Sequence, residues 1–201
     1  MKWNNALRDF EHYLKIERGL SNHTVVNYRL DVQKLISYLE QHNHSETPTE
    51  IETDHVKSFL YELAKSVNTR TQSRVISGLR SFFDYLIFEN YRNSNPLEQI
   101  EAPKIGRKLP DTLSVKEIDK IVAAIDLSHP LGERNRAIIE TLYSCGLRVS
   151  ELTDLKLSDL FFDEGFIKVN GKGNKQRFVP IGEHTQKFIN LYRQHARLLL
   201  K

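Results

Sequence analysis

An arginine and a glutamate lie three residues apart at the start of a predicted short helix. Gly146 ends one helical pattern, and the next runs from Leu147 to Leu155 with Arg148 in its first turn. The positive end of the helix dipole disfavours a cation there by about 0.3–1 kcal/mol. Glu151, on the same face, can pair with Arg148. A phosphate at the helix N-terminus is the other candidate anion. The spacing favours the ion pair, and both interactions can coexist, with Glu151 orienting the guanidinium.

A lysine stands between two glycines in a predicted β-hairpin turn. The segments 166–169 (FIKV) and 177–181 (RFVPI) have strand character, and Lys172 lies in the NGKGNK segment that joins them. Gly171 and Gly173 leave space for a long amine to move toward a ligand. A lysine placed this way could act as a general acid toward a leaving oxygen. The alternative is a tight turn rich in Gly and Asn whose lysines are simply solvated.

Two segments carry only basic charges. Between Leu63 and Phe83, and again between Phe166 and Phe178, every ionised side chain is Lys or Arg; the first set is Lys65, Arg70, Arg74 and Arg80, and the second is Lys168, Lys172, Lys175 and Arg177. One such run is commonly a solvated surface. Two runs in separate halves of a chain with a net charge of only +3 favour binding to a polyanion such as duplex DNA. Lys175 and Arg177 are then candidates for positioning phosphates.

The sequence shows no pattern typical of metal or nucleotide chemistry. The eight histidines fit neither an HExxH motif nor a Cys/His pattern, and His42 and His44 fall in a polar loop. Neither GxxxxGK[ST] nor GxGxxG is present. We therefore expect no metal site and no cofactor.

Apolar periodicity predicts a helical first part. Four helices are expected: one over 3–14, one capped by Ser21, one that opens at Thr53, and one that starts near Thr69 with Gln72 completing a capping box. The apolar stripes of these helices are expected to form the core of a four-helix bundle.

A proline-rich segment separates this bundle from a second part. Pro96, Pro103 and Pro110 predict an extended linker, because proline lacks a backbone donor and restricts the preceding residue. Ser114 and Glu117 then form a capping box for a further helix. With the hairpin, the pattern predicts a mainly α protein with a small β-hairpin or sheet (α+β). Its domains would be residues 1–92, a linker over 93–112, and residues 113–201.

Composition and the N-terminal segment exclude several classes of protein. The chain has 201 residues, of which 27% are charged and 39% hydrophobic, as in an ordinary globular protein. Its single cysteine, Cys145, excludes an internal disulfide framework and fits a reducing compartment. The N-terminal segment has Asp9 and Glu11 where a signal peptide would be apolar. We expect a cytoplasmic protein without a membrane segment.

Two longer motifs carry a family resemblance. TLYSCGLRVSELTDLKLSDL at 141–160 and IKVNGKGNKQRFVPIG at 167–182 resemble the tyrosine site-specific recombinases, or phage-integrase family. Essentially the whole chain resembles the bacterial Xer-type chromosome-dimer resolvases. The N-terminal segments LKIERGLSNHTVVNYRLDVQKLISYLE and SRVISGLRSFFDYLIFENYRNSNPLEQIEAPK are similar to the family's helical, SAM-like core-binding domain. Residues 113–201 would then be a partial catalytic domain.

The resemblance implies roles for particular residues. Arg148 resembles the first catalytic arginine, which binds the scissile phosphate, and Glu151 resembles the acidic residue that supports it. Lys172 resembles the general acid that protonates the departing 5′ oxygen. The family joins DNA to a tyrosine through a 3′-phosphotyrosyl bond and needs neither metal nor ATP for strand exchange. Implied partners are a duplex DNA recombination site, other recombinase protomers in a full-length tetramer, and a DNA translocase.

The chain departs from the family pattern after Gly182. Nothing beyond it supplies the His-x-x-Arg segment, a second His or Trp, or the helix with the nucleophilic tyrosine. The resemblance therefore implies a shortened form that binds DNA without cleaving it. Tyr143 is expected in the core, and Tyr192 lies outside any matching motif, so neither is expected to replace the nucleophile.

Two other classes of function remain as alternatives. The segment 137–155 also imitates a helix-turn-helix, which would suit a non-catalytic DNA-binding regulator. That interpretation leaves the hairpin unexplained, and Val149, Leu152 and Leu155 recur at core spacing rather than as polar base-reading residues. The third reading is a protein-interaction domain, which would not bind random duplex DNA.

Overall fold

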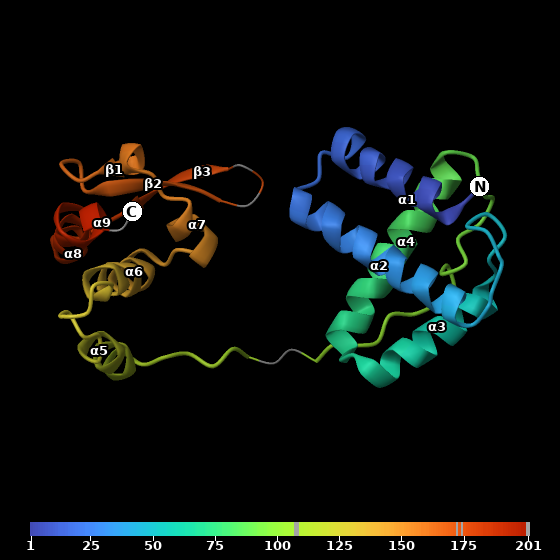
Figure 1. Cartoon of the computed structure of the whole chain (residues 1–201), viewed down its shortest axis with the longest axis horizontal. Helices are drawn as coiled ribbons and strands as arrows, with labels where there is room; N and C mark the ends of the chain where they lie inside the picture. The colour runs from blue at the N-terminus through green and yellow to red at the C-terminus, as the bar shows by residue number, and fades with distance from the viewer. Residues whose placement is uncertain (107–108, 172, 174, 200–201) are drawn as a thin grey trace. The chain divides into compact units, whose positions relative to one another are not determined.

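The computed structural model describes residues 1–106, 109–171, 173 and 175–199. The chain divides into two compact units, Met1–Lys108 and Leu109–Lys201 (Figure 1). Lys172, predicted to lie in the hairpin turn, is outside the described residues. Each unit has its own hydrophobic core. Among the helices of the described segments, none combines the length and apolarity needed to cross a membrane.

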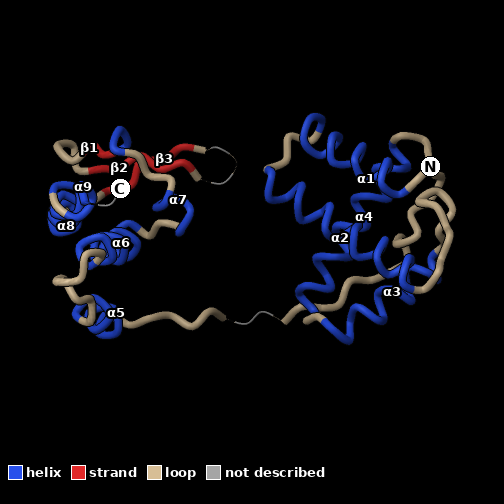
Figure 2. The backbone as a smooth tube through the Cα atoms, in the orientation of Figure 1, coloured by secondary structure: helices blue, strands red, loops and turns tan. Residues whose placement is uncertain are grey.

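The N-terminal unit is helical, as the apolar periodicity predicts. Its elements are α1 (Trp3–His12), which continues as a π-helical turn over Tyr13–Glu17, α2 (Asn22–Gln41), α3 (Thr53–Ser66) and α4 (Thr69–Phe88). Figure 2 shows these helices in blue, joined by tan loops. α2 packs against α1, α3 and α4.

Local capping sets where these helices begin. The Ser21 hydroxyl accepts a hydrogen bond from the Thr24 amide and caps α2, as predicted. The start of α4 differs from the prediction, because the side chain of Asn68 accepts from the Thr71 amide at 2.9 Å. Asn68 has an extended backbone and takes the N-cap position that the sequence predicted for Thr69.

The core of this unit is aromatic at its centre. Phe82 is fully buried, with its ring centroid 5.3 Å from that of Phe10 and 5.2 Å from that of Phe83, both in edge-to-face arrangements. Aromatic pairs in these arrangements add stability beyond the area they bury. Helices α1 and α4 therefore meet through these rings at the centre of the core.

The C-terminal unit combines helices with a small sheet. It contains α5 (Val115–Ala123), α6 (Gly132–Cys145), α7 (Val149–Thr153), a 3₁₀ turn (Leu157–Asp159), β1 (Leu160–Phe161), β2 (Phe166–Asn170), β3 (Gln176–Pro180), α8 (Glu183–Gln194) and α9 (Ala196–Leu199). The predicted fold class, mainly α with a small antiparallel sheet, is confirmed. The predicted capping box of α5 is also present, with Ser114 and Glu117 bonded to each other.

The sheet sets which side chains of the hairpin face the core. The strand order is β1-β2-β3, and Val169 of β2 pairs with Arg177 of β3 (Figure 2, strands in red). Ile167 and Val169 point to the core, so Lys168 between them points to the opposite face. β1 is short and was not expected from the sequence.

Two apolar features of this unit are exposed, and the second differs from the prediction. α5 buries none of its residues, and Ile121 is 40% exposed. Tyr143 was expected in the core but is 51% exposed. The buried positions of α6 include Ala137, Thr141 and Cys145, which are spaced by four residues. Tyr143 lies two residues from Thr141, which places it on the other side of the helix.

Candidate active site and nucleic-acid interface

A buried carboxylate organises the site in the C-terminal unit. Glu151 of α7 is 3% exposed, and both of its oxygens accept hydrogen bonds from arginines. Oε1 lies 2.9 Å from Nη1 of Arg148 and 2.7 Å from Nη1 of Arg177, and Oε2 lies 2.8 Å from Nη2 of Arg177. One carboxylate thus connects α7 to β3.

The turn before α7 places Arg148 for this contact. Gly146 ends α6 with φ of +58°, the left-handed conformation that glycine adopts without strain. Arg148 is then the extended N-cap residue of α7, and its backbone amide donates to Oε2 of Glu151 at 2.9 Å. The predicted local ion pair between Arg148 and Glu151 is therefore present.

The guanidinium of Arg148 remains accessible despite this pairing. Its side chain is 67% exposed, whereas that of Glu151 is 2% exposed. Only Nη1 is bonded to the carboxylate among the described contacts, so the other donors of the guanidinium can reach an anion from solvent. Glu151 therefore orients Arg148 through one nitrogen and leaves the rest of the guanidinium exposed.

Arg177 makes a contact within the protein that the sequence did not predict. Its place in the basic hairpin predicts a contact with phosphate, and in the structure its two Nη atoms bind both oxygens of Glu151 in a bidentate pair. The two partners are 26 positions apart in the sequence, which explains why local spacing gave no signal for this pair. Gly171 leaves room for it, since a Cβ atom there would lie 3.2 Å from both Arg177 Nη1 and Glu151 Oε1.

These hydrogen bonds change the acidity of Glu151. The bidentate bonds from Arg177, followed by the amide of Arg148, hold the pKa of Glu151 well below its ordinary value. The pKa of Arg177 is raised by the same pair. The site therefore keeps three fixed charges, two positive and one negative, with a net positive charge that attracts an anion.

A second buried carboxylate supports the hairpin. Asp159 is 4% exposed and lies 3.1 Å from Nζ of Lys168, and the amide of Lys156 donates to it. The bond from Lys168 lowers the pKa of Asp159. Lys168, the basic residue of β2, is thus held in an ion pair with Asp159.

The remaining hairpin cation that the structure describes is free of such a contact. Lys175 is exposed, next to the bond at 2.8 Å in which the Gly171 amide donates to the Lys175 carbonyl. Lys172 lies outside the described residues, so its assignment as the general acid stays a prediction from the sequence.

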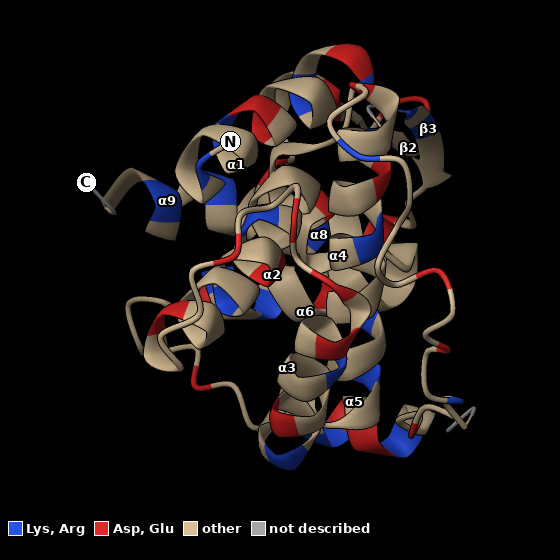
Figure 3. Ribbon diagram, turned by 90° about the vertical axis from the view of Figure 1, so that its right-hand side faces the viewer, with Lys and Arg blue, Asp and Glu red and all other residues tan. Residues whose placement is uncertain are grey.

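The basic residues of the N-terminal unit fall into two groups. Arg74 pairs with buried Asp31 at 2.6 Å, and Arg80 donates to the Ile100 carbonyl at 2.8 Å. Lys65 lies over the ring of Tyr61 and remains exposed, and Arg70 is exposed at the start of α4. Figure 3 shows both charge signs along the helices, in blue and red. Lys65 and Arg70 are the better candidates of this set for phosphate contacts.

The geometry of α7 does not suit a recognition helix. It spans five residues, and Leu152 and the following Leu155 pack against the hydrophobic core. Side chains that fill the core cannot read base edges, so the helix-turn-helix alternative is not favoured.

Comparison with known proteins gives the family of the chain. Residues 7–90 match the phage integrase N-terminal SAM-like domain, and residues 111–198 match the phage integrase family. A tyrosine recombinase XerD of Oceanobacillus iheyensis is 42% identical over 193 residues, 96% of this chain and 65% of that protein. The XerD of Listeria monocytogenes is 36% identical over 199 residues, 98% of this chain and 67% of that protein. The chain belongs to the phage integrase family of tyrosine recombinases.

Solved structures of this family share the fold. A lambda integrase dimer bound to a COC′ core site aligns with a TM-score of 0.74 at 20% identity, covering 97% of this chain and 55% of that one. The XerH site-specific recombinase bound to palindromic difH substrate aligns with a TM-score of 0.67 at 22% identity, covering 92% and 56%. This chain spans about two thirds of the length of the curated XerD relatives.

Proposed function

We propose that this chain takes part in site-specific DNA recombination of the chromosome-dimer-resolution type, with duplex DNA as its ligand. The observation that carries this proposal is the accessible guanidinium of Arg148, held from behind by buried Glu151 in a chain of the tyrosine recombinase family. Both similar XerD proteins are named tyrosine recombinases, which supports DNA recombination, integration, chromosome partition and cell division as the setting.

Arg148 would bind the scissile phosphate and stabilise the charge that develops during strand transfer. A preorganised donor of this kind contributes about 10²–10³-fold to the rate in other enzymes. Glu151 would act as a positioning residue, and Arg177 would hold Glu151 in turn. Because Glu151 stays ionised, it fixes both arginines without needing a proton transfer of its own.

Lys172 would supply the proton for the departing 5′ oxygen, as the family resemblance implies. Phosphates away from the reacting bond would be contacted by Lys65, Arg70 and Lys175. Further contacts would come from the guanidinium nitrogens of Arg74, Arg80 and Arg177 that are not bonded within the protein. Such contacts position the duplex and carry no sequence information.

The partners follow from the same proposal. Structures similar in fold include a lambda integrase tetramer bound to a Holliday junction and XerH bound to a difH substrate. These support a recombination site on duplex DNA and other recombinase protomers as partners of this chain. A DNA translocase as regulator, and the bacterial cytoplasm as location, complete the proposal.

Affinity for duplex DNA as a function of salt tests the binding step. We expect fluorescence anisotropy with a labelled duplex to show tight binding at low salt and a linear fall of log affinity with log salt, with a slope of about −0.9 per phosphate contact. Lys175→Ala and Arg70→Ala should each reduce the magnitude of that slope by about 0.9. Lys57→Ala, which removes an exposed lysine paired with Asp54, is the matched control and should leave it unchanged. Affinity that does not respond to salt would contradict the proposal.

A nicked suicide duplex tests the chemistry of the 201 residues. We expect no covalent protein–DNA adduct on denaturing gels, because no tyrosine here lies in the family's nucleophile motif. An adduct that disappears with Tyr143→Phe or Tyr192→Phe would show that one of these tyrosines attacks DNA.

A further inference from the structure

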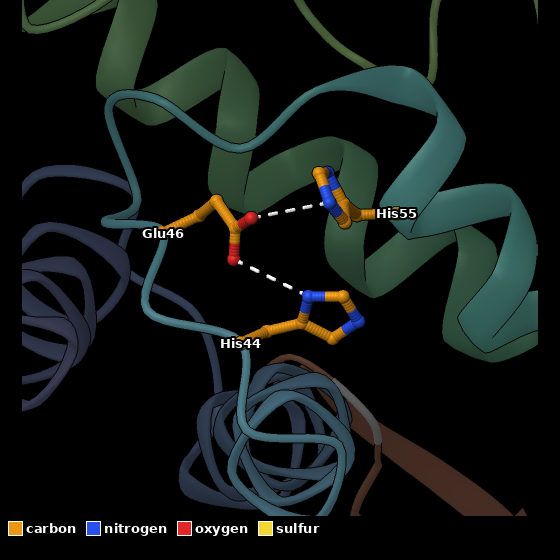
Figure 4. A group of neighbouring side chains, drawn as sticks. All are labelled: His44, Glu46 and His55. Atoms are coloured by element: carbon orange, nitrogen blue, oxygen red, sulfur yellow. Dashed lines mark ion pairs between the residues drawn. The ribbon is translucent and has the colours of Figure 1, made fainter.

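Three side chains with metal-ligating chemistry meet in the N-terminal unit, and none of them is among the residues proposed to contact DNA. His44 and Glu46 lie in the loop between α2 and α3, and His55 lies in the first turn of α3 (Figure 4). One ligand atom from each residue lies within 4.8 Å of the other two. The helix start fixes His55, and the loop brings the other two side chains to it.

The carboxylate of Glu46 lies between the two imidazoles (Figure 4). Its Oε1 is 3.2 Å from Nε2 of His55, and its Oε2 is 3.6 Å from Nδ1 of His44. The two rings are 4.9 Å apart between centroids and nearly perpendicular, with an interplanar angle of 78°. Both rings therefore direct a nitrogen toward the same carboxylate.

Two atoms of this cluster are covered but lack a hydrogen-bond partner among the described residues. They are Oε2 of Glu46 and Nδ1 of His55. A covered polar atom without a partner costs free energy, and in native proteins it is commonly satisfied by a water molecule or an ion. The three side chains are 28–32% exposed, so a small ion can enter from solvent.

We propose that His44, Glu46 and His55 form a binding site for a divalent transition-metal ion of the zinc class. Two imidazoles and one carboxylate are a ligand set that Zn²⁺ accepts, with a water molecule as fourth ligand. Tetrahedral bonds of ~2.0–2.2 Å place neighbouring ligand atoms about 3.4 Å apart. The separations of 3.2 and 3.6 Å between the imidazole nitrogens and the Glu46 oxygens lie on either side of that value. Because the three ligand atoms lie within 4.8 Å of one another, the longest separation would contract by at most about 1.4 Å.

The site would join three parts of the bundle. The Trp3 indole nitrogen donates to the Glu46 carbonyl at 2.9 Å, which ties the loop to α1, and His55 ties it to α3. A bound ion would therefore cross-link the loop to a helix in the folded state and stabilise that state by binding it selectively.

A neighbouring histidine is engaged elsewhere. Nδ1 of His42 lies 2.9 Å from the Tyr38 carbonyl, and its Nε2 lies 3.5 Å from Glu62. Because His42 is engaged in these contacts, the proposed metal ligands are His44, Glu46 and His55. The competing explanation is that Glu46 simply forms ion pairs with the two imidazoles, and the experiment must separate the two.

Metal titration of the whole 201-residue chain, without an affinity tag and after EDTA treatment and desalting, tests the proposal. Calorimetry with Zn²⁺ should show saturable binding of one ion per chain, and Co²⁺ should give visible d–d absorption. Zn²⁺ should also raise the melting temperature, whereas Mg²⁺, which prefers oxygen ligands, should not.

Variants identify the ligands. His55→Gln and Glu46→Gln should weaken Zn²⁺ binding by about tenfold or more and remove the melting-temperature shift. His23→Gln, which changes an exposed histidine at the start of α2, is the matched control and should bind as the parent does. A cooperative melt in EDTA shows that each variant is folded, and His44→Gln replaces either variant that does not fold.

Two results would overturn the proposal. One is a parent chain that shows neither saturable Zn²⁺ binding nor a shift in melting temperature, which would leave only the ion pairs. The other is unchanged binding in folded His55→Gln and Glu46→Gln, which would assign the ion to other residues.

Discussion

Each unit of the chain buries a carboxylate against arginine, and the two carboxyl groups differ in acidity. Asp31 in α2 is fully buried, and desolvation raises its pKa despite the nearby charge of Arg74. Glu151 in α7 is almost as buried, and its pKa is lowered because the hydrogen bonds from Arg177 and Arg148 outweigh desolvation. Burial alone therefore does not decide the charge state of a carboxyl group.

The difference lies in the number and geometry of donors. Asp31 accepts one short bond from Arg74 on Oδ2, while Oδ1 has no hydrogen bond among the described residues and only Lys34 at 3.8 Å. Glu151 accepts one backbone and three guanidinium bonds that occupy both oxygens. A carboxylate with all its lone pairs satisfied can hold two arginines in place, including one that faces solvent.

The largest difference between the two units is expected when an arginine bound to each carboxylate is replaced by alanine. In a longer form that also carries the last third of the XerD relatives, we expect Arg148→Ala to reduce strand-exchange turnover by about 10²–10³-fold, because a phosphate donor is lost. Arg74→Ala should instead lower the free energy of unfolding, because it leaves Asp31 buried without its partner. Turnover on a nicked or junction substrate and urea denaturation measure the two effects.

The control for this contrast is Arg8→Ala, which removes an exposed arginine paired with its neighbour Asp9 and should change neither quantity. A variant Arg148→Ala that unfolds at much lower urea with little specific loss of turnover would make Arg148 a structural residue.

A methyl group beside Asp31 should give the next largest effect. The Cβ of an alanine at position 78 would lie 2.7 Å from Oδ2 and 3.0 Å from Cβ of Asp31. We expect Gly78→Ala to lower the free energy of unfolding by about 1–3 kcal/mol through overpacking, despite the better helix propensity of alanine. Urea denaturation measures it, with the exposed neighbour Ser77→Ala as control. A Gly78→Ala variant as stable as the parent would show that Asp31 is not tightly enclosed.

The smallest effect is expected at acidic pH, where the contributions of the two carboxyl groups to stability should change in opposite directions. Glu151 has a native pKa below its ordinary 4.5, so its ionised form stabilises the fold above about pH 4.5, and this is lost as the pH falls toward the native pKa. Asp31 has a native pKa above its ordinary 3.8, so its contribution becomes more favourable as the pH falls through that native pKa.

The stability difference between the parent and Glu151→Gln should therefore shrink from pH 7 to pH 4, whereas the parent should gain stability relative to Asp31→Asn. Urea denaturation of the three proteins at pH 7, 5 and 4 measures both differences. If the two stability differences changed with pH in the same direction, the proposed difference between Glu151 and Asp31 would be contradicted.

Features that depend on neighbouring residues were predictable from the sequence. The cap at Ser21, the capping box of Ser114 and Glu117, the left-handed stop at Gly146 and the pair Arg148–Glu151 all involve residues within about one helical turn. The family motifs are also short segments of sequence. The similarity of the chain to the XerD relatives confirms the family that these motifs predicted. The predicted cap at Thr69 was wrong by one residue, because Thr69 and Asn68 both have capping side chains.

The pairing of distant side chains needed the tertiary structure. Arg177 meets Glu151 only because the β2–β3 register and the close approach at Gly171 bring β3 to α7. Arg74 meets Asp31 across 43 residues because α2 and α4 pack at Gly78. The sequence alone predicts phosphate contacts for both arginines. His44 lies in a loop, as the sequence predicts, and the fold brings the centroid of its ring to within 4.9 Å of that of His55. Sequence spacing determines which residues can cap, turn or pair within one element, because those interactions span a few residues. Packing decides which charges meet across elements, since only the folded chain fixes distances between segments far apart in sequence.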